Sequence, residues 1–234
     1  MKHISVLLNE SIDGLNIKPK GIYVDATLGG AGHSKEIIKR LESGFLYAFD
    51  QDDFAINYAT DILKEYNNYH LIKSNFRYLQ SELNKLGVTK IDGILFDLGL
   101  SSFQIDDRKR GFSYLDDYNL DMRMDQDKNI TAKDILNTYS LDELVKIFRD
   151  YGEEKNAYQI AKRIVERRPL HKTSDLVSIT DEVNYKVKGH SAKRVFQALR
   201  IEVNEELDVL KEALDQLIDL LNTGGRIVII TFHS

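Results

Sequence analysis

The sequence contains no cysteine, which excludes disulfide bonds, thiolate nucleophiles and zinc sites built from cysteine. It also lacks any apolar run near the ~20 residues that a membrane-spanning helix needs. The apolar stretch at its start, MKHISVLLNES, is too short for a signal peptide, so a cytoplasmic location is expected. No two histidines have the spacing of metal ligands, and no metal site is expected. With a formal net charge of -5, the whole chain is not a basic nucleic-acid clamp.

Strand and helix patterns alternate in the first part of the chain. Short, nearly continuous apolar runs typical of buried strands lie at 22–26, 45–49, 69–73 and 91–96. Helix-like stretches separate them, at 33–43, 52–66 and 76–87. This alternation predicts a parallel sheet with helices on both faces. The middle helix is predicted to carry one apolar stripe, made of Phe54, Tyr58, Ile62 and Tyr66 with Ala55, Ala59 and Leu63 beside them.

The pattern changes after Asp97. From 104 to 200 the sequence is polar and helical, with candidate helices at 131–137, 141–150, 153–168, 174–186 and from about 191. Ser140 and Glu143 predict a capping box at the start of the second of these helices. An amphipathic helix is predicted at 204–222, with one face made of Leu207, Leu210, Leu214, Leu217 and Leu221, and RIVIITF then predicts another buried strand.

The return of the strand pattern bears on domain organisation. It favours one α/β domain formed by residues 1–103 and 201–234, with an all-helical insert at 104–200. Two separate domains are the alternative.

A glycine-rich segment, DATLGGAGHS at 25–34, directly follows the first predicted strand. Its glycines match neither G-x-G-x-x-G nor the phosphate-binding loop, which needs Lys and Ser or Thr after the last glycine. Without Cβ atoms, Gly29, Gly30 and Gly32 would let a ligand approach the backbone at a helix N-terminus. A tight turn without a ligand explains the glycines equally well, and they leave both interpretations open.

Three carboxylates lie at or beside predicted strand ends: Asp25, Asp50 and Asp97. Parallel sheets bind ligands beyond the carboxyl ends of their strands, where the strand order reverses. Asp50 follows Gly30 by about 20 residues, the position at which a carboxylate accepts both hydroxyls of a ribose. A helix-capping role within DQDD is the alternative for Asp50. The combination favours an adenosine-type ligand; Phe76 could border its adenine, although core packing is the commoner role of a single phenylalanine.

A family resemblance rests on seven segments that occur in order along the chain: HISVLLNE, DATLGGAGHS, DGILFDLGLSSFQIDD, RGFSYLDDYNLDMRMD, YGEEKNAYQIAKRIV, FQALRIEVNEEL and GGRIVIITFHS. Together they resemble the bacterial ribosomal RNA small-subunit methyltransferase H family. The resemblance implies a Rossmann-like class I methyltransferase sheet with a helical insert. It also implies methyl transfer from S-adenosyl-L-methionine to the exocyclic N4 of a cytosine in the decoding region of 16S ribosomal RNA. Family members continue past Ser234 with the last strands of the sheet, so the chain is expected to be truncated.

The same resemblance implies a set of site residues. The cofactor would contact Gly30, Ala31, Gly32, His33, Asp50, Phe76, Asp97 and Gln104. Within this set, Ala31, Gly32 and His33 would meet the methionine end, and Asp50 would hold the ribose. Asp97 is the candidate catalytic residue, either orienting the amine or receiving its proton; holding the cofactor is its alternative role.

Basic residues concentrate in the predicted insert. No acid lies between Asn184 and Ile201, and this segment supplies the candidate RNA-binding residues Lys186, Lys188, Lys193, Arg194 and Arg200. A second group contains Arg163, Arg167, Arg168 and Lys172. Helix faces that pair with nearby acids are the alternative for every one of these residues. Phe103, Phe112 and Tyr114 are candidates for stacking on an extruded base.

Two other functional classes remain in view. An NAD-type oxidoreductase shares the glycine loop and the ribose acid, but it predicts the G-x-G-x-x-G spacing that residues 29–34 lack. A non-catalytic RNA-binding or assembly module would need the basic residues and not the cofactor site. The expected partner in either RNA-based interpretation is small-subunit ribosomal RNA.

Overall fold

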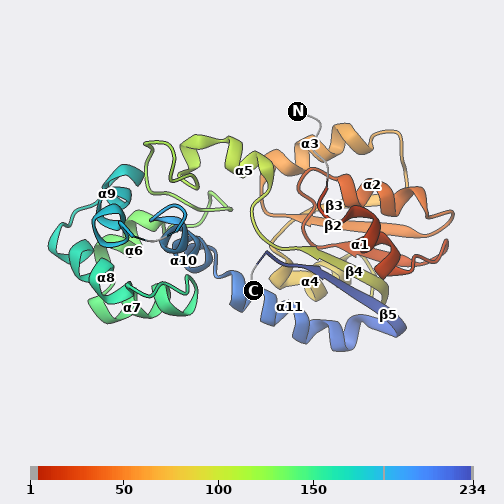
Figure 1. The fold of residues 1–234 in the computed structure, drawn as a ribbon. Helices are drawn as coiled ribbons and strands as arrows, with labels where there is room; N and C mark the ends of the chain where they lie inside the picture. Colours follow the sequence, from red (N-terminus) through yellow and green to blue (C-terminus); the bar gives the residue numbers. More distant parts are fainter. Residues whose placement is uncertain (1–4, 187, 233–234) are drawn as a thin grey trace. The chain divides into compact units, whose positions relative to one another are not determined.

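The computed structural model describes residues 5–186 and 188–232. Within these residues the chain forms two compact units. The first runs to Phe103 and resumes at Asp208, and the second comprises Gln104–Leu207 (Figure 1). The terminal motifs HISVLLNE and GGRIVIITFHS include residues 3–4 and 233–234, which lie outside the described residues.

The described residues of the first unit form a five-stranded parallel sheet in the order β3-β2-β1-β4-β5. The strands are β1 (Ile22–Asp25), β2 (Phe45–Asp50), β3 (Tyr69–Lys73), β4 (Ile91–Asp97) and β5 (Leu221–Ile230). The predicted parallel sheet is therefore confirmed. The strand order reverses between β1 and β4, because the chain moves outward from β1 to β3 before it returns to β4.

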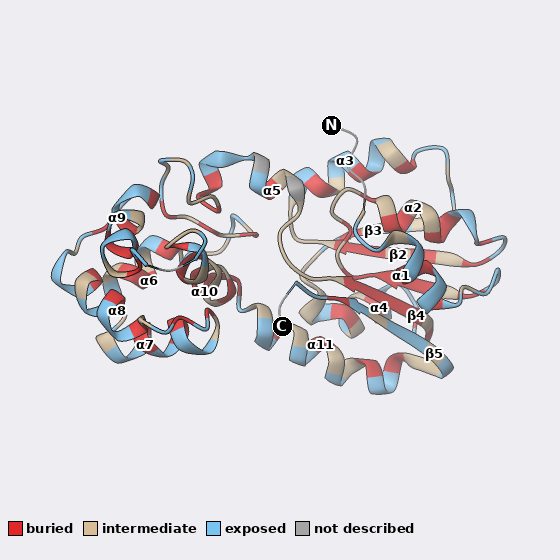
Figure 2. Ribbon diagram, in the orientation of Figure 1, coloured by how far each residue is buried: buried red, intermediate tan, exposed pale blue. Residues whose placement is uncertain are grey.

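Helices cover both faces of this sheet, and β1, β2 and β4 between them are largely buried (Figure 2). One face carries α1 (Leu8–Leu15), α2 (Gly32–Lys39) and α3 (Asp53–Leu63); the other carries the 3-10 turn η1 (Phe76–Tyr78), α4 (Leu79–Lys85) and α11 (Glu206–Leu220). Successive strand residues point to opposite faces, so Tyr23 packs in the first core and Val24 in the second.

The prediction that RIVIITF forms a buried strand is wrong for burial. The strand β5 forms, but Ile227 and Ile229 are 41% and 39% exposed, because β5 pairs with β4 on one side and is the last strand in the order.

Helix α1 has no counterpart among the predicted helices. It begins after Leu7, which has a left-handed φ of 47° and makes no side-chain capping bond. A serine, threonine, aspartate or asparagine cap is the usual sequence signal of a helix start, and that signal is missing here. Ile12 and Leu15 are buried, so α1 is stabilised by packing on the core.

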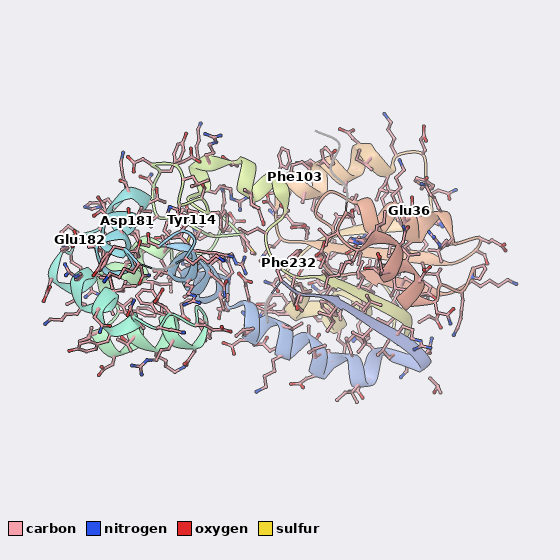
Figure 3. The ribbon with its side chains drawn as sticks, viewed as in Figure 1. Glu36, Phe103, Tyr114, Asp181, Glu182 and Phe232 are labelled. Carbon is pink, nitrogen blue, oxygen red and sulfur yellow. The ribbon has the colours of Figure 1, made fainter. Side chains whose placement is uncertain are left out.

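The predicted apolar stripe of α3 is partly wrong. Ala55, Ala59 and Leu63 are buried as expected. In contrast, Phe54 is 55% exposed and Tyr58 is 36% exposed. Both rings lie against Phe103, with centroid distances of 5.1 Å and 4.7 Å (Phe103 is labelled in Figure 3). Apolar residues repeat every four positions on two adjacent faces of this helix, so the sequence does not distinguish them. Packing against the sheet determines which face is buried.

Helix α11 departs from its predicted buried face at one residue. Leu217 is buried as predicted, but Leu207 is 51% exposed. The buried face consists of Val209, Ala213, Leu217 and Leu220. Leu210, Leu214 and Leu221 are partly buried and pack against the same core as Leu217, so the predicted leucine face does pack on the sheet, except at Leu207.

The described secondary structure of the second unit is helical, apart from an isolated antiparallel bridge between Asn119 and Lys172. Its elements are η2 (Arg108–Arg110), α6 (Ala132–Thr138), α7 (Leu141–Asp150), α8 (Ala157–Glu166), α9 (Thr173–Val183) and α10 (Lys193–Asn204), with α5 (Ser102–Asp106) at the boundary between the units. The predicted capping box of α7 is confirmed, since Ser140 and Glu143 exchange backbone and side-chain hydrogen bonds. Helix α8 begins later than predicted, because Glu153 adopts a left-handed φ of 50°.

The segment LDMRMD, at 120–125, forms an irregular loop in the core of this unit. Leu120, Met122 and Met124 are buried. The side chain of Asn204 accepts from the Met124 N–H at 2.7 Å and donates to the Met122 carbonyl at 2.8 Å. The Arg110 guanidinium donates to the Met124 carbonyl at 2.6 Å. This motif thus has a structural role, because side chains and the backbone of neighbouring loops satisfy its buried backbone groups in place of a helix or strand.

We expect Asn204→Ala to lower the free energy of unfolding by about 2–4 kcal/mol, because it removes the partners of a buried N–H and a buried carbonyl. Urea unfolding followed by circular dichroism measures the change. Asn129→Ala, at an exposed position of the same unit, is the matched control. A loss for Asn204→Ala no larger than that of the control would contradict the structural role of Asn204.

Candidate functional site

The glycine loop connects β1 to α2 at the point where the strand order reverses. Gly29 and Ala31 both adopt left-handed backbone, with φ of 46° and 58°. Such a φ costs little for glycine and more for alanine. The Gly29 N–H donates to Oδ2 of Asp50 at 2.9 Å, and the Ala31 N–H donates to the Leu28 carbonyl at 2.8 Å. These bonds hold the loop in one conformation.

Asp50 ties this loop to the end of β2. Its Oδ2 accepts from Gly29, and its Oδ1 accepts from the Asp52 N–H at 2.9 Å. Asp52, and not Asp50, caps α3 by accepting from the Phe54 N–H. Each oxygen of a carboxylate has a second lone pair, so Asp50 keeps acceptor capacity for ligand hydroxyls. Burial raises the pKa of Asp50 to about 6, against the opposing effect of its two backbone hydrogen bonds.

The strand register places Asp50 and Asp97 at matching heights on either side of β1. Asp25, the last residue of β1, pairs with Ala48 of β2 on one side and with Leu95 of β4 on the other. Both neighbouring strands continue beyond these partners, to Asp50 and to Asp97 respectively. The two carboxylates therefore flank the start of the glycine loop, which is the arrangement predicted for a ligand at the switch point.

Asp25 itself has a structural role. It is buried, its Oδ2 accepts from the Ser34 hydroxyl at 2.7 Å, and its Oδ1 accepts from the Thr27 N–H at 3.1 Å. Burial raises its pKa, with the hydrogen bond from Ser34 as the largest opposing effect. These contacts join the end of β1 to the first turn of α2 and use both carboxylate oxygens.

Asp97 lies close to His33. The Nδ1 atom of His33 is 3.9 Å from Oδ2 of Asp97, whose side chain is 26% exposed. The Asp97 N–H donates to the Thr27 hydroxyl at 2.7 Å, which fixes the end of β4 beside the glycine loop. His33 is buried, and its Nε2 lies 3.0 Å from the carbonyl oxygen of Val6. The structure thus brings together Asp97 and His33, two of the predicted cofactor residues.

The remaining predicted cofactor residues differ in their surroundings. The Phe76 ring is half-buried and packs edge-on against Phe96 at 5.4 Å. Gly30 is half-buried, and Ala31 is fully buried, so neither the backbone nor the side chain of Ala31 is exposed in this conformation. Gln104 is buried on α5 and belongs to the second unit.

The first basic group divides into exposed and paired residues. Lys186, Lys188 and Lys193 are exposed, and Arg194 is half-buried. The Arg200 guanidinium donates to both carboxylate oxygens of Glu206, at 2.8 Å and 3.1 Å. Arg200 therefore serves to join α10 to the start of α11, and the three lysines are the exposed members of this group.

The residues of the second basic group form hydrogen bonds and ion pairs with other residues of the protein. Arg163 and Arg167 both pair with Glu182 of α9 (labelled in Figure 3). Arg168 donates to the carbonyls of Leu136 and Tyr139. Lys172 pairs with Asp117. For this group the pairing alternative fits the observed contacts.

The three aromatic candidates for base stacking already have protein partners. Phe103 contacts Phe54 and Tyr58, as described above. Phe112 is buried, with the Arg110 guanidinium 5.7 Å from its ring centre. Tyr114, labelled in Figure 3, stacks on His190 at 4.2 Å. Phe112 is therefore closed to a base in this conformation, whereas Phe103 and Tyr114 are half-buried.

Sequence reasoning missed three residues that support the candidate cofactor residues. Thr27 holds the end of β4, Ser5 lies against Gly32, and the Val6 carbonyl lies against His33. The contacts to Gly32 and His33 involve the chain before α1, a helix without a capping signal. A local sequence pattern does not predict a contact between an irregular segment and a loop that is distant in the sequence.

In the part of the chain that the structure describes, no helix combines the length and apolar character needed to cross a membrane. The same residues contain no group of three or more histidine, aspartate and glutamate side chains placed to hold a metal ion.

Comparison with known proteins gives a consistent result. The profile of the MraW methylase family matches residues 1–234. Ribosomal RNA small subunit methyltransferase H 1 of Acholeplasma laidlawii is 65% identical over 100% of this chain and 78% of its own length. The methyltransferase H proteins of onion yellows phytoplasma and Finegoldia magna are 56% and 51% identical, over 99% and 100% of this chain and 76% and 78% of their own lengths. A solved rRNA methylase from Streptococcus thermophilus is 25% identical over 42% of this chain and 53% of its own, with a TM-score of 0.35. The match over the whole sequence shows that this chain belongs to the MraW methylase family.

Proposed function

We propose that this protein transfers a methyl group from S-adenosylmethionine to the exocyclic N4 of a cytosine in the decoding region of small-subunit ribosomal RNA. One observation carries the proposal: Asp50 and Asp97 flank the glycine loop at matching register, at the switch point of a parallel sheet. The relatives named above are ribosomal RNA small-subunit methyltransferases, which supports the RNA substrate. The sequence resemblance supports the choice of base and atom.

The residues present fit the methyl donor. Asp50 offers carboxylate lone pairs to ribose hydroxyls, and its position is fixed by two backbone N–H groups. The half-buried Phe76 ring offers an apolar edge for adenine, and the left-handed backbone at Gly29 brings the loop beside Asp50. When bound, S-adenosylmethionine supplies a methyl group made electrophilic by a positively charged sulfur.

Asp97 is the residue best placed to act on the amine. The exocyclic amine of cytosine is a poor nucleophile, because its lone pair is delocalised into the ring. A carboxylate that accepts a hydrogen bond from the amine orients the nitrogen and receives its proton as the new bond forms. Asp97 is partly exposed and its backbone is anchored by Thr27, so a partly accessible carboxylate projects from a fixed strand end. The target base must first leave its stack to reach such a site.

The helical unit supplies a surface suited to RNA. Lys186, Lys188 and Lys193 are exposed, and no acid occurs in the sequence between Asn184 and Ile201. Tyr185 is 74% exposed, with the Lys186 ammonium 5.1 Å from its ring centre. An exposed aromatic ring beside several lysines is typical of sites that hold unpaired nucleotides. Phosphate contacts of this kind would position the RNA, and the base would be read at the methyl-transfer site.

Replacing Lys186, Lys188 and Lys193 together by glutamine is expected to weaken RNA binding across sequences. The slope of log affinity against log salt concentration should become shallower by about 2, since each phosphate contact contributes about 0.7–0.9. Fluorescence anisotropy with a small-subunit RNA fragment over a salt series measures this slope. The matched control replaces the exposed Lys133, Lys146 and Lys162 of the same unit. Equal slopes for both triple variants would contradict the assigned surface.

Methyl transfer from isotopically labelled S-adenosylmethionine to purified small ribosomal subunits tests the proposed function. Mass spectrometry of the digested RNA is expected to show label in N4-methylated cytidine from the decoding region. Label in another nucleoside would reject the choice of base. RNA binding without measurable affinity for the donor would favour the non-catalytic module.

A further inference from the structure

The third glycine of the loop, Gly32, lies against Ser5, near the start of the chain. A Cβ atom built on Gly32 would lie 2.0 Å from Oγ of Ser5 and 3.2 Å from its Cβ. Gly32 does not have a left-handed φ, so its backbone suits any residue. The space that a side chain would fill at Gly32 is therefore taken by Ser5, and close packing explains the glycine.

Ser5, Val6 and Leu7, here termed the N-terminal strap, connect this contact to α1. The Val6 carbonyl lies 3.0 Å from Nε2 of His33, one residue after Gly32. Leu7 then adopts a left-handed φ of 47°, which is costly for a non-glycine residue. Such a conformation persists where both sides are fixed, and here α1 is anchored by the buried Ile12 and Leu15. The strap is thus held against the loop at one end and on the core at the other.

The strap determines which nitrogen of His33 carries the proton. A carbonyl oxygen can only accept, so the contact with Val6 requires a hydrogen on Nε2. In the neutral ring, Nδ1 then carries the lone pair. Nδ1 is the nitrogen that faces Oδ2 of Asp97, at 3.9 Å. The buried ring therefore presents a proton acceptor to the carboxylate assigned above to the amine.

We propose that the N-terminal strap is a positioning element, which holds His33 in the Nε2–H tautomer so that Nδ1 takes over the proton collected by Asp97. This inference rests on the proposed function. The lone pair of the amine nitrogen forms the new N–C bond, while the bond between the methyl carbon and the donor sulfur breaks and its electron pair leaves on sulfur. An N–H bond of the amine breaks as well, and its electron pair stays on the nitrogen. The proton goes to Oδ2 of Asp97 and then to Nδ1 of His33, which returns the carboxylate to its ionised form. The distance of 3.9 Å must shorten by about 1 Å during this second transfer.

The tautomer is measured directly by long-range 1H–15N correlation spectra of the uniformly labelled protein, without donor or RNA. We expect the His33 spectrum to show the Nε2–H form, with the signal assigned by its loss in His33→Gln. Gly32→Ala should displace the strap, shift His33 to a tautomer mixture and lower kcat by roughly tenfold to a hundredfold, the loss typical of a reacting group misplaced by about 1 Å.

A rescue series separates strap packing from ligand packing at Gly32. Combined with Gly32→Ala, Ser5→Ala removes the atom at 2.0 Å and Ser5→Gly also removes the one at 3.2 Å. The fraction of the Nε2–H tautomer and kcat should recover partly with Ser5→Ala and more fully with Ser5→Gly. Gly14→Ala is the matched control, because the nearest atom to a Cβ at this helix glycine is a methyl group of Val228 at 3.2 Å and no atom of the strap. It should leave the His33 spectrum unchanged.

Three results would overturn the strap proposal: an Nδ1–H tautomer in the wild type, a harmless Gly32→Ala, or a damaging Gly32→Ala that Ser5→Gly does not rescue. The last result would assign the space at Gly32 to a ligand. Failure of the proposed function gives a different result, because the wild type would then show no methyl transfer. The tautomer of His33 in the wild type and the variants would still test the role of the strap.

Discussion

Asp97→Asn is expected to slow methyl transfer by roughly a hundredfold to ten-thousandfold, the range for loss of a general base. Asparagine keeps the size of the side chain and the backbone bond to Thr27. Its amide still orients a donor through one oxygen but does not accept the proton. Single-turnover kinetics with small ribosomal subunits measures the rate, and calorimetry with S-adenosylmethionine measures the affinity for the donor.

The ratio of these two losses identifies the role of Asp97. A catalytic carboxylate predicts a large loss in rate and a much smaller loss in donor affinity. Losses of equal size would make Asp97 a binding residue. Asp61→Asn, at an exposed position on α3, is the control for a change of one negative charge and should affect neither quantity.

Asp50→Ala is expected to weaken binding of S-adenosylmethionine by about thirtyfold to a thousandfold, which corresponds to about 2–4 kcal/mol of lost hydrogen bonding to a charged acceptor. The variant also frees the Gly29 N–H, so the glycine loop loses its bond to β2. Calorimetry measures the affinity. Asp53→Ala is the matched control, because Asp53 is an exposed acid in the same DQDD segment, paired only at the surface with Lys73. Similar losses for both variants would contradict a ribose-binding role for Asp50.

The affinity for the donor should also depend on pH through Asp50. The pKa of this carboxyl is raised to about 6, so it is mostly ionised at pH 7 and mostly protonated at pH 5. The ionised form accepts both ribose hydroxyls, and protonation removes part of this acceptor capacity. Affinity is therefore expected to be constant above about pH 7 and to fall as the pH drops through 6, by up to about tenfold per pH unit. Asp50→Asn should have a lower affinity that is constant over the same range.

Strands buried on both faces could be predicted from the sequence, because such strands are apolar at nearly every position. The run at 91–96 is an example, and the sheet indeed buries it. The positions of Asp50 and Asp97 follow from the same reasoning, since strand ends in a parallel sheet meet at one edge. These parts of the candidate site needed only local pattern and a topological rule.

The features that escaped prediction depend on contacts between distant segments. Helix α1 begins at a left-handed leucine, which no propensity rule selects. Phe54 and Tyr58 belong to an apolar period, yet they face Phe103 and not the core. Gly32 shows the same point most clearly, because its missing side chain is explained by Ser5, which no pattern within DATLGGAGHS could indicate.

Charge was the least predictable property of the helical unit. Of the nine basic residues in the two groups, the sequence alone could not distinguish Lys193 from Arg200. In the structure Lys193 is exposed, whereas Arg200 forms two hydrogen bonds with a glutamate six positions along the chain. Pairing depends on side-chain direction at the junction of two helices, and spacing along the sequence does not fix it.

The place of β5 in the sheet has a consequence for synthesis on the ribosome. β5 pairs with β4, but the whole helical unit is translated between these two strands. One edge of β4 is therefore unpaired while the helical unit is synthesised. An open apolar strand edge invites pairing with other chains, and parallel pairing across a long intervening segment is slow. We therefore expect the helical unit to fold early, because a compact insert shortens the effective loop that must close. Pairing of β5 with β4 would then follow the folding of the helical unit, and conditions that delay this unit should increase aggregation of nascent chains.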